Sequence, residues 1–193
     1  MEPLLAIERI AQPAPDLTGV AALAFTSRNG VDAFATLSEE RALPVFAVGD
    51  ATAGAARAAG FAPVRSAAGA LADLARLLAE AGPGPVLAPG ALEPSGDLPA
   101  LLADRVEVRP LPVYRSVETG AAAPAVFDAV LVHSSRAGRA VAALGPFAGQ
   151  VAAAISNTAA APLTGVAGLE IRVAARPDEA ALFEALGKPA PRV

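Results

Sequence analysis

The chain has 193 residues, of which 54% are apolar and 18% charged, so it has enough apolar side chains for one large domain or two small ones. Its net charge of −4 and the lack of a Lys/Arg cluster argue against nucleic acid as a partner. The absence of Cys and the single His exclude disulfides, thiolate metal sites and multi-histidine metal sites. No apolar run reaches the roughly 18 residues of a membrane-spanning helix. The first ten residues do not resemble a signal peptide, so we expect a cytoplasmic protein that binds neither nucleic acid nor a membrane.

Short apolar runs alternate with helical segments over the first half of the chain, a rhythm typical of parallel α/β folds. The clearest helix has Leu at positions 71, 74, 77 and 78 and is stopped by Gly82-Pro83. The expected strands are Val20–Phe25, Val45–Val48, Phe61–Arg65, Val86–Ala88 and Val106–Val108. The expected helices are Asn29–Leu37, Thr52–Ala59, Leu71–Ala81 and Leu98–Leu102.

An extended segment with two prolines, Arg109–Thr119, follows and contains the only tyrosine, Tyr114. The first ten residues have a similar character, so the two stretches can pair as a two-stranded connector. After residue 119 the alternation of apolar runs and helical segments resumes. The expected strands are Ala129–Val132, Val151–Ile155 and Ile171–Ala174, and the expected helices are Ala137–Leu144, a short one from Thr158, and Pro177–Leu186.

The two halves repeat each other at a constant offset of 107 residues. Ser27 corresponds to Ser134, each at the end of an apolar run and before a helix of small residues. Gly49 corresponds to Ser156, and Val64-Arg65 corresponds to Ile171-Arg172. A register held without a gap over some forty residues indicates two related structural units.

These patterns predict an α/β fold of two lobes, each with a parallel sheet flanked by helices. We expect residues 1–10 and 109–119 to form a β connector, residues 11–108 the first lobe, and residues 120–193 the second lobe.

The turns that follow the strands are the best candidates for a binding site, because ligands of open α/β sheets lie beyond the carboxyl ends of the strands. Free N–H groups at helix N-termini bind carboxylates and phosphates there without a basic side chain. The same Ser, Thr and Asn residues are also ordinary N-caps, so both interpretations stay open. Gly49–Gly54 matches neither the dinucleotide fingerprint nor the P-loop, which disfavours a nucleotide-binding enzyme. The phenol of Tyr114 can either pack or offer its O–H to a ligand.

Five segments, taken in order, resemble uroporphyrinogen-III synthases. They are FTSRNGVDAF at Phe25–Phe34, PVFAVGDATAGAARAAGF at Pro44–Phe61, LPVYRSVE at Leu111–Glu118, FDAVLVHSSRAGRAV at Phe127–Val141 and AAAISNTAAAPL at Ala152–Leu163. No single motif is very specific, but the ordered set spans nearly the whole chain.

The resemblance implies two α/β lobes joined by a two-stranded β connector, with the active site in the cleft between them. It implies a cofactor-free carbon–oxygen lyase of haem biosynthesis, acting as a monomer on a linear tetrapyrrole, hydroxymethylbilane. Loss of the substrate's hydroxyl gives an azafulvenium ion, which attacks the last ring to form a spiro intermediate. That ring is then inverted, and the macrocycle closes as uroporphyrinogen III.

The resemblance also assigns roles to individual residues. Tyr114 is the candidate for assisting the departure of hydroxide. The candidates for binding the substrate are Ser27, Asn29, Thr52, Ser134, Arg136 and Thr158.

The chain departs from the family pattern in two places. The turn Ile155–Ala159 has no Gly where the family usually has one. Family members also begin with a further strand and helix, so we expect the second lobe to lack its N-terminal strand and helix. The alternative function is therefore a non-catalytic or truncated two-lobed relative that binds a tetrapyrrole or another polycarboxylate.

Overall fold

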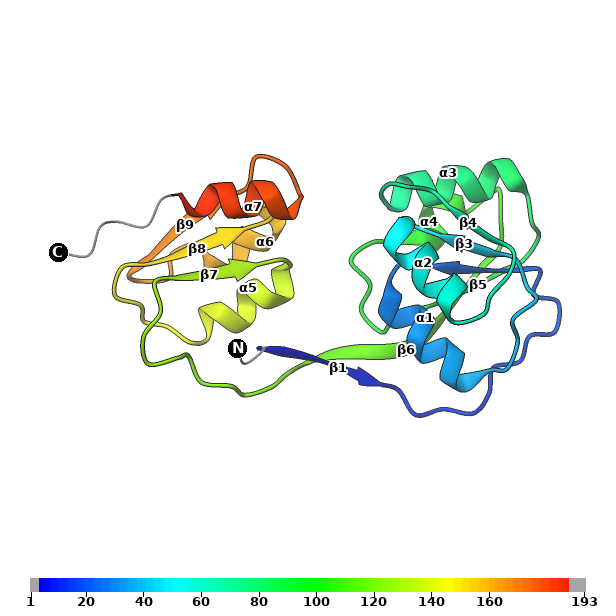
Figure 1. Cartoon of the computed structure of the whole chain (residues 1–193), viewed down its shortest axis with the longest axis horizontal. Coiled ribbons are helices and arrows are strands. Elements are labelled where there is room, and N and C mark those ends of the chain that lie inside the picture. The colour runs from blue at the N-terminus through cyan, green and yellow to red at the C-terminus, as the bar shows by residue number, and fades with distance from the viewer. Residues whose placement is uncertain (1–3, 188–193) are drawn as a thin grey trace. The chain divides into compact units, whose positions relative to one another are not determined.

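The computed structural model describes residues 4–187, in which helices flank parallel sheets (Figure 1). The chain divides into two compact units. The larger unit is Ile7–Ser116, and the smaller unit combines Met1–Ala6 with Val117–Val193. The structure thus confirms the predicted α/β class. No helix in the described part of the chain has the length and apolarity needed to cross a membrane.

The larger unit contains most of a six-stranded sheet with the order β1-β6-β5-β2-β3-β4, in which β1 begins and β6 ends among residues of the smaller unit. The neighbouring strands from β6 to β4 pair in parallel. At the other edge β1 runs antiparallel to β6. Two hydrogen bonds show this direction: Ile10 N–H donates to the Val113 carbonyl, and Thr119 N–H donates to the Leu4 carbonyl. The strands are β1 Leu5–Arg9, β2 Ala22–Phe25, β3 Val45–Ala47, β4 Val64–Ser66, β5 Val86–Ala91 and β6 Val108–Glu118.

Helices cover both faces of this sheet, as its fully apolar central strands require. The helices are α1 Arg28–Leu37, α2 Asp50–Ala58, α3 Leu71–Ala81 and α4 Leu98–Leu102. On the face of α1 and α2, three buried phenylalanines form an aromatic cluster with ring centroids 5.7, 6.0 and 6.2 Å apart: Phe25, Phe34 and Phe61. On the other face Leu74 and Leu78 of α3 and Leu102 of α4 pack against β2 and β5.

The smaller unit has a three-stranded parallel sheet in the order β7-β8-β9. Its strands are β7 Ala129–Val132, β8 Gln150–Ala154 and β9 Leu169–Val173. Its helices are α5 Ser135–Ala142, α6 Asn157–Ala160, the 3₁₀ turn η1 Ala161–Leu163 and α7 Glu179–Leu186. Val132, Ala152 and Leu163 belong to the core on one face, and Leu182 packs on the other.

The repeat predicted from the sequence is confirmed at the level of strand register. Leu23 pairs with Val45 in the larger unit, and Val130 pairs with Ala152 in the smaller one, 107 residues later on both strands. The next strand keeps the offset, since Val45 pairs with Val64 and Ala152 pairs with Ile171. The two units therefore share one β-α-β-α-β arrangement.

The extended segment that contains Tyr114 differs from the prediction. A strand at Val106–Val108 and a separate connector were expected, but a single strand, β6, runs from Val108 to Glu118 and pairs with β5 as far as Tyr114. Tyr114 is therefore part of a sheet. Pro110 and Pro112 of β6 pair with Ala88 and Gly90 of β5, and neither proline has a backbone N–H to donate.

The N-terminus of α1 packs directly on β5, which makes one glycine indispensable there. A Cβ on Gly30 would lie 2.7 Å from the Pro89 carbonyl oxygen, whereas a Cβ on Gly54 of α2 would meet nothing within 4 Å. We expect Gly30→Ala to lower the free energy of unfolding by ~1–3 kcal/mol through overpacking. We expect Gly54→Ala, the matched control, to raise it by ~0.5–1 kcal/mol. Denaturant unfolding checks both, and equal effects of the two substitutions would contradict this packing.

Candidate active site

Three serines cap the helices that follow the strands. Ser27 Oγ accepts a hydrogen bond from Gly30 N–H at 3.1 Å, at the start of α1. Ser134 Oγ accepts from Ala137 N–H at 3.1 Å at the start of α5, and Ser156 Oγ accepts from the first turn of α6 at 3.2 Å. The N-cap interpretation of Ser27 and Ser134 is therefore correct, and any role in binding is additional to it.

The other predicted binding residues differ in how far their side chains are exposed. Asn29 and Thr158 are exposed in the first turns of α1 and α6, where a ligand can reach them. Arg136 is half-buried near the start of α5 and already has an interaction partner. Thr52 is only 6% exposed, because it lies on the inner side of α2 beside the buried Ala53.

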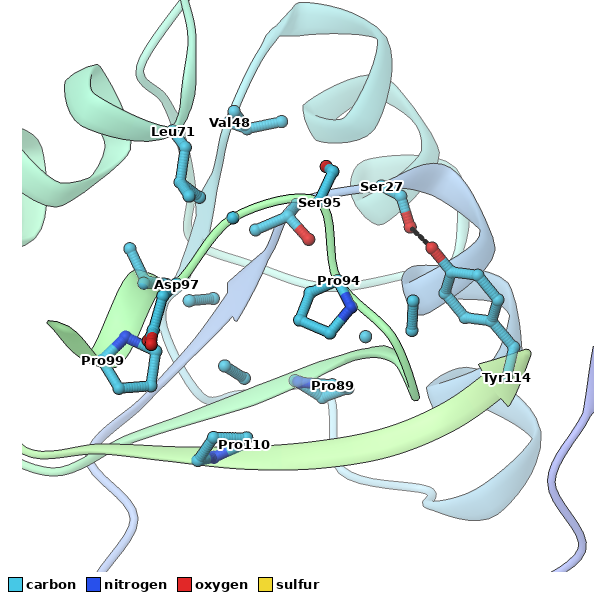
Figure 2. Close-up of a pocket in the computed structure, with 17 residues that line it drawn as sticks. Ser27, Val48, Leu71, Pro89, Pro94, Ser95, Asp97, Pro99, Pro110 and Tyr114 are labelled. Atoms are coloured by element: carbon cyan, nitrogen blue, oxygen red, sulfur yellow. Dashed lines mark hydrogen bonds between the residues drawn. The ribbon is translucent and has the colours of Figure 1, made fainter. Parts of the chain in front are cut away.

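Tyr114 is buried, and its phenol makes a specific contact. Its side chain is 8% exposed and packs beside Ala33 of α1. Its hydroxyl lies 2.8 Å from Ser27 Oγ, in a hydrogen bond in which either group can be the donor. Figure 2 shows this bond at the edge of a pocket.

A β-bulge directs the Tyr114 side chain toward α1. Gly90 pairs with Pro112 and Ala91 pairs with Tyr114, so Val113 is an extra residue on β6. Successive side chains of a regular strand point to opposite faces. The bulge lets both Val113 and Tyr114 pack against α1.

The pocket has a volume of about 720 Å³ and lies within the larger unit, beyond the carboxyl end of β2 and along β5. Figure 2 shows Ser27 and Tyr114 on one side of it and Asp97 and Pro99 on another. Ser27 and Tyr114 are the two predicted site residues that line it. Apolar residues form most of its wall, with hydroxyls from Thr26, Ser27, Ser95 and Tyr114.

The loop between β5 and α4 supplies a part of the wall that the sequence reading missed. Pro94, Ser95, Gly96 and Asp97 line the pocket. The turn-forming composition of Pro-Ser-Gly-Asp was a usable signal. The strand before this loop was expected to end at Ala88, whereas β5 continues to Ala91.

Asp97 is the one charged residue in the described lining of the pocket. Its Oδ1 accepts a hydrogen bond of 2.9 Å from Ala100 N–H and so caps α4. Two carboxyls elsewhere also accept hydrogen bonds at the start of a helix, Asp73 from Ala70 N–H and Asp178 from Ala181 N–H. These bonds hold the pKa of each of the two carboxyls below its usual value. Neither of those two carboxyls lines the pocket.

The pocket therefore combines an apolar wall with a phenol and one carboxylate. Such a lining suits a largely apolar ring system that develops positive charge, and it suits a carboxylate poorly, because Asp97 would repel one. Elsewhere between residues 4 and 187, no three His, Asp or Glu side chains gather in a way that could hold a metal ion.

Solved structures with a similar fold are known. The chain is similar to uroporphyrinogen-III synthetase from Helicobacter pylori, with a TM-score of 0.74, 20% identity, and coverage of 94% of this chain and 88% of that one. It is also similar to a mutant uroporphyrinogen III synthase from Thermus thermophilus, with a TM-score of 0.50, 19% identity, and coverage of 97% and 79%. At these identities the likeness shows the fold.

Comparison at the level of sequence identifies the family. None of the curated proteins searched matches the chain. The family model described as uroporphyrinogen-III synthase HemD matches residues 1–184, nearly the whole length. The chain belongs to the uroporphyrinogen-III synthase family.

Proposed function

We propose that the chain converts hydroxymethylbilane to uroporphyrinogen III, with Tyr114 as the acid that assists loss of the substrate's hydroxyl. Membership of the family supports this reaction in haem biosynthesis. The observation that carries the role of Tyr114 is the placement of its phenol, which lies at the pocket edge in a 2.8 Å hydrogen bond with Ser27.

In the first step, the phenol donates its proton to the departing hydroxyl. The carbon–oxygen bond breaks, water leaves, and the pyrrole nitrogen supplies the electron pair that forms the azafulvenium cation. The O–H of a phenol can act as such a general acid. The carbon electrophile then attacks the last ring to give the spiro intermediate. The bond between the spiro carbon and its neighbouring methylene then breaks, and that methylene bonds to the free α-carbon of the same ring, which inverts the ring and closes the macrocycle. This α-carbon loses its proton, which can return to the phenolate.

The charges of the pocket decide which part of the substrate it holds. The substrate carries eight carboxylates, and the charged group that lines the pocket is itself a carboxylate, Asp97. The pocket therefore holds the ring that bears the hydroxymethyl group, and the carboxylates stay outside it. Asp97 and the new phenolate then face a developing cation, which electrostatic attraction stabilises.

The substrate's carboxylates fit the turns at the strand ends. Helix N-termini favour anions there, and binding the carboxylates holds the substrate for ring closure. We assign this binding to Asn29, Ser134, Arg136 and Thr158. Thr52 would join them only after a local rearrangement, because its side chain is buried.

We also propose a division of the chain into two lobes and a connector. Residues 1–10 and 109–119 act as a two-stranded connector between lobes of residues 11–108 and 120–193. The antiparallel hydrogen bonds between β1 and β6 support it, as does the ion pair between Arg115 Nε and Glu8 Oε2 across these strands.

Removing the phenolic oxygen tests the proposed acid. We expect Tyr114→Phe to lower kcat by about two orders of magnitude, since general acids typically contribute that much or more. The fold should persist, because the ring keeps its packing against Ala33 and Val113. The measurement is the rate of uroporphyrinogen III formation, and circular dichroism checks that the variant is folded. An unchanged kcat would reassign Tyr114 to packing. Substrate binding without turnover in the wild-type chain would instead favour the non-catalytic tetrapyrrole-binding protein.

Neutralising the pocket's carboxylate tests the orientation of the substrate. We expect Asp97→Asn to lower kcat roughly three- to tenfold while KM stays level or falls, because the variant loses attraction for the cation and repulsion of the carboxylates. Asn is as good an N-cap as Asp, so α4 should be kept. Asp178→Asn is the matched control, because Asp178 caps α7 in the same way, accepting from Ala181 N–H at 2.8 Å outside the pocket. Equal kcat in the two variants would remove Asp97 from the mechanism.

A further inference from the structure

We propose that Ser27 is a positioning residue for Tyr114 and acts on the reaction through the phenol, in place of the substrate contact expected from the sequence. This inference rests on the proposed role of Tyr114 as the acid. It follows from how the hydrogen-bonding capacity of the Ser27 hydroxyl is used.

The protein itself occupies most of that capacity. A serine hydroxyl has one proton to donate and two lone pairs that accept. Gly30 N–H donates a hydrogen bond to Ser27 Oγ at 3.1 Å. The Tyr114 hydroxyl forms a second hydrogen bond with Ser27 Oγ at 2.8 Å. The side chain is also half-buried. When Ser27 donates its proton to the phenol, no proton is left on it for a carboxylate of the substrate.

The arrangement favours one direction of hydrogen bonding when the phenol acts as an acid. If Ser27 donates its proton to the phenolic oxygen, the phenol's own O–H is free to point into the pocket. Once the phenol has given up its proton, the resulting phenolate accepts the same serine hydrogen bond, now charge-assisted and stronger. The chain from Gly30 N–H through Ser27 Oγ–H to Tyr114 is then aligned, and hydrogen bonds in such a chain strengthen one another.

The repeat supplies an internal comparison for Ser27. Ser134 stands 107 residues later, caps α5 through a bond of the same length, 3.1 Å, and is exposed. The sequence has one tyrosine, so Ser134 has no phenol to hold. Capping therefore explains what the two serines share, and the Tyr114 contact is what distinguishes Ser27.

The backbone around Ser27 is held rigidly relative to Tyr114. The start of α1 packs against the Pro89 carbonyl, where a Cβ on Gly30 would come within 2.7 Å. Pro89 belongs to β5, and two residues later Ala91 of the same strand pairs with Tyr114. Ser27 and Tyr114 are thus fixed to one strand from two sides, as a positioning contact requires.

The single tyrosine makes a direct test possible. The chain has one Tyr and no Trp, so its tyrosine absorption and fluorescence report Tyr114 alone. Ser27→Gly removes the hydroxyl at small cost to the cap, because Gly is tolerated at this position, and Ser27→Asn also caps without a hydroxyl. Ser27→Thr restores a hydroxyl. Ser134→Gly is the matched control for the spectrum.

We expect Ser27→Gly to shift the tyrosine spectrum and to lower kcat about tenfold, with KM changed less than twofold, a loss typical of supporting residues. Ser27→Thr should recover both, Ser27→Asn should behave like Ser27→Gly, and Ser134→Gly should leave the spectrum unchanged. In the Tyr114→Phe background, Ser27→Gly should cause no additional loss of kcat.

Three outcomes would overturn the proposal: an unshifted tyrosine spectrum in Ser27→Gly, a rise in KM at constant kcat, or an equal loss of kcat in the Tyr114→Phe background. The spectrum tests the contact without reference to activity. An unaltered rate in Tyr114→Phe alone would refute the proposed acid, whereas a slow Tyr114→Phe with a fully active Ser27→Gly would refute only the role of Ser27.

Discussion

A hydrogen bond of 2.8 Å joins the hydroxyls of Tyr114 and Ser27, which are 87 residues apart in the chain. It forms because β5 pairs in parallel with both β2 and β6 and so brings the end of β2 near the middle of β6. Two strand spacings, about 9.6 Å, separate β2 from β6. The Tyr114 side chain, the hydrogen bond and the Ser27 side chain span this gap together. The bulge at Val113 turns that side chain to the face of α1, where Ser27 is the N-cap. The strand pairing of β5, the bulge at Val113 and the N-cap Ser27 together place the phenol at the edge of the pocket.

The two units show how one arrangement of strands and helices can be put to different uses. Their strand registers agree at an offset of 107 residues, and the serines at equivalent positions cap equivalent helices. The larger unit adds β5 beside β2, and with it the wall of the pocket and the partner strand for β6. The proposed acid, Tyr114, therefore lies in the larger unit, and exposed Ser134 and Thr158 of the smaller unit are proposed to bind carboxylates.

The sequence predicted the elements whose signals are local. The leucine spacing before Gly82 predicted α3 at Leu71–Ala81, and the repeat predicted β7 at Ala129–Val132. The site was only partly predictable, because its geometry depends on contacts between distant segments. Tyr114 and Ser27 were both named as candidates, but nothing local to either residue indicated that they touch. The bulge at Val113 depends on the register with β5, and the role of the loop at Pro94–Asp97 depends on how far β5 extends. Burial of Thr52 likewise follows from how α2 packs on the sheet.

The proposed reaction of this chain is closure of the linear tetrapyrrole with inversion of its last ring. The most direct measurement incubates the full chain with hydroxymethylbilane and separates the ring-inverted from the uninverted uroporphyrinogen. We expect ring-inverted uroporphyrinogen III at a rate well above the spontaneous reaction, without any added cofactor. Formation of only the uninverted product, at the rate seen without protein, would contradict it.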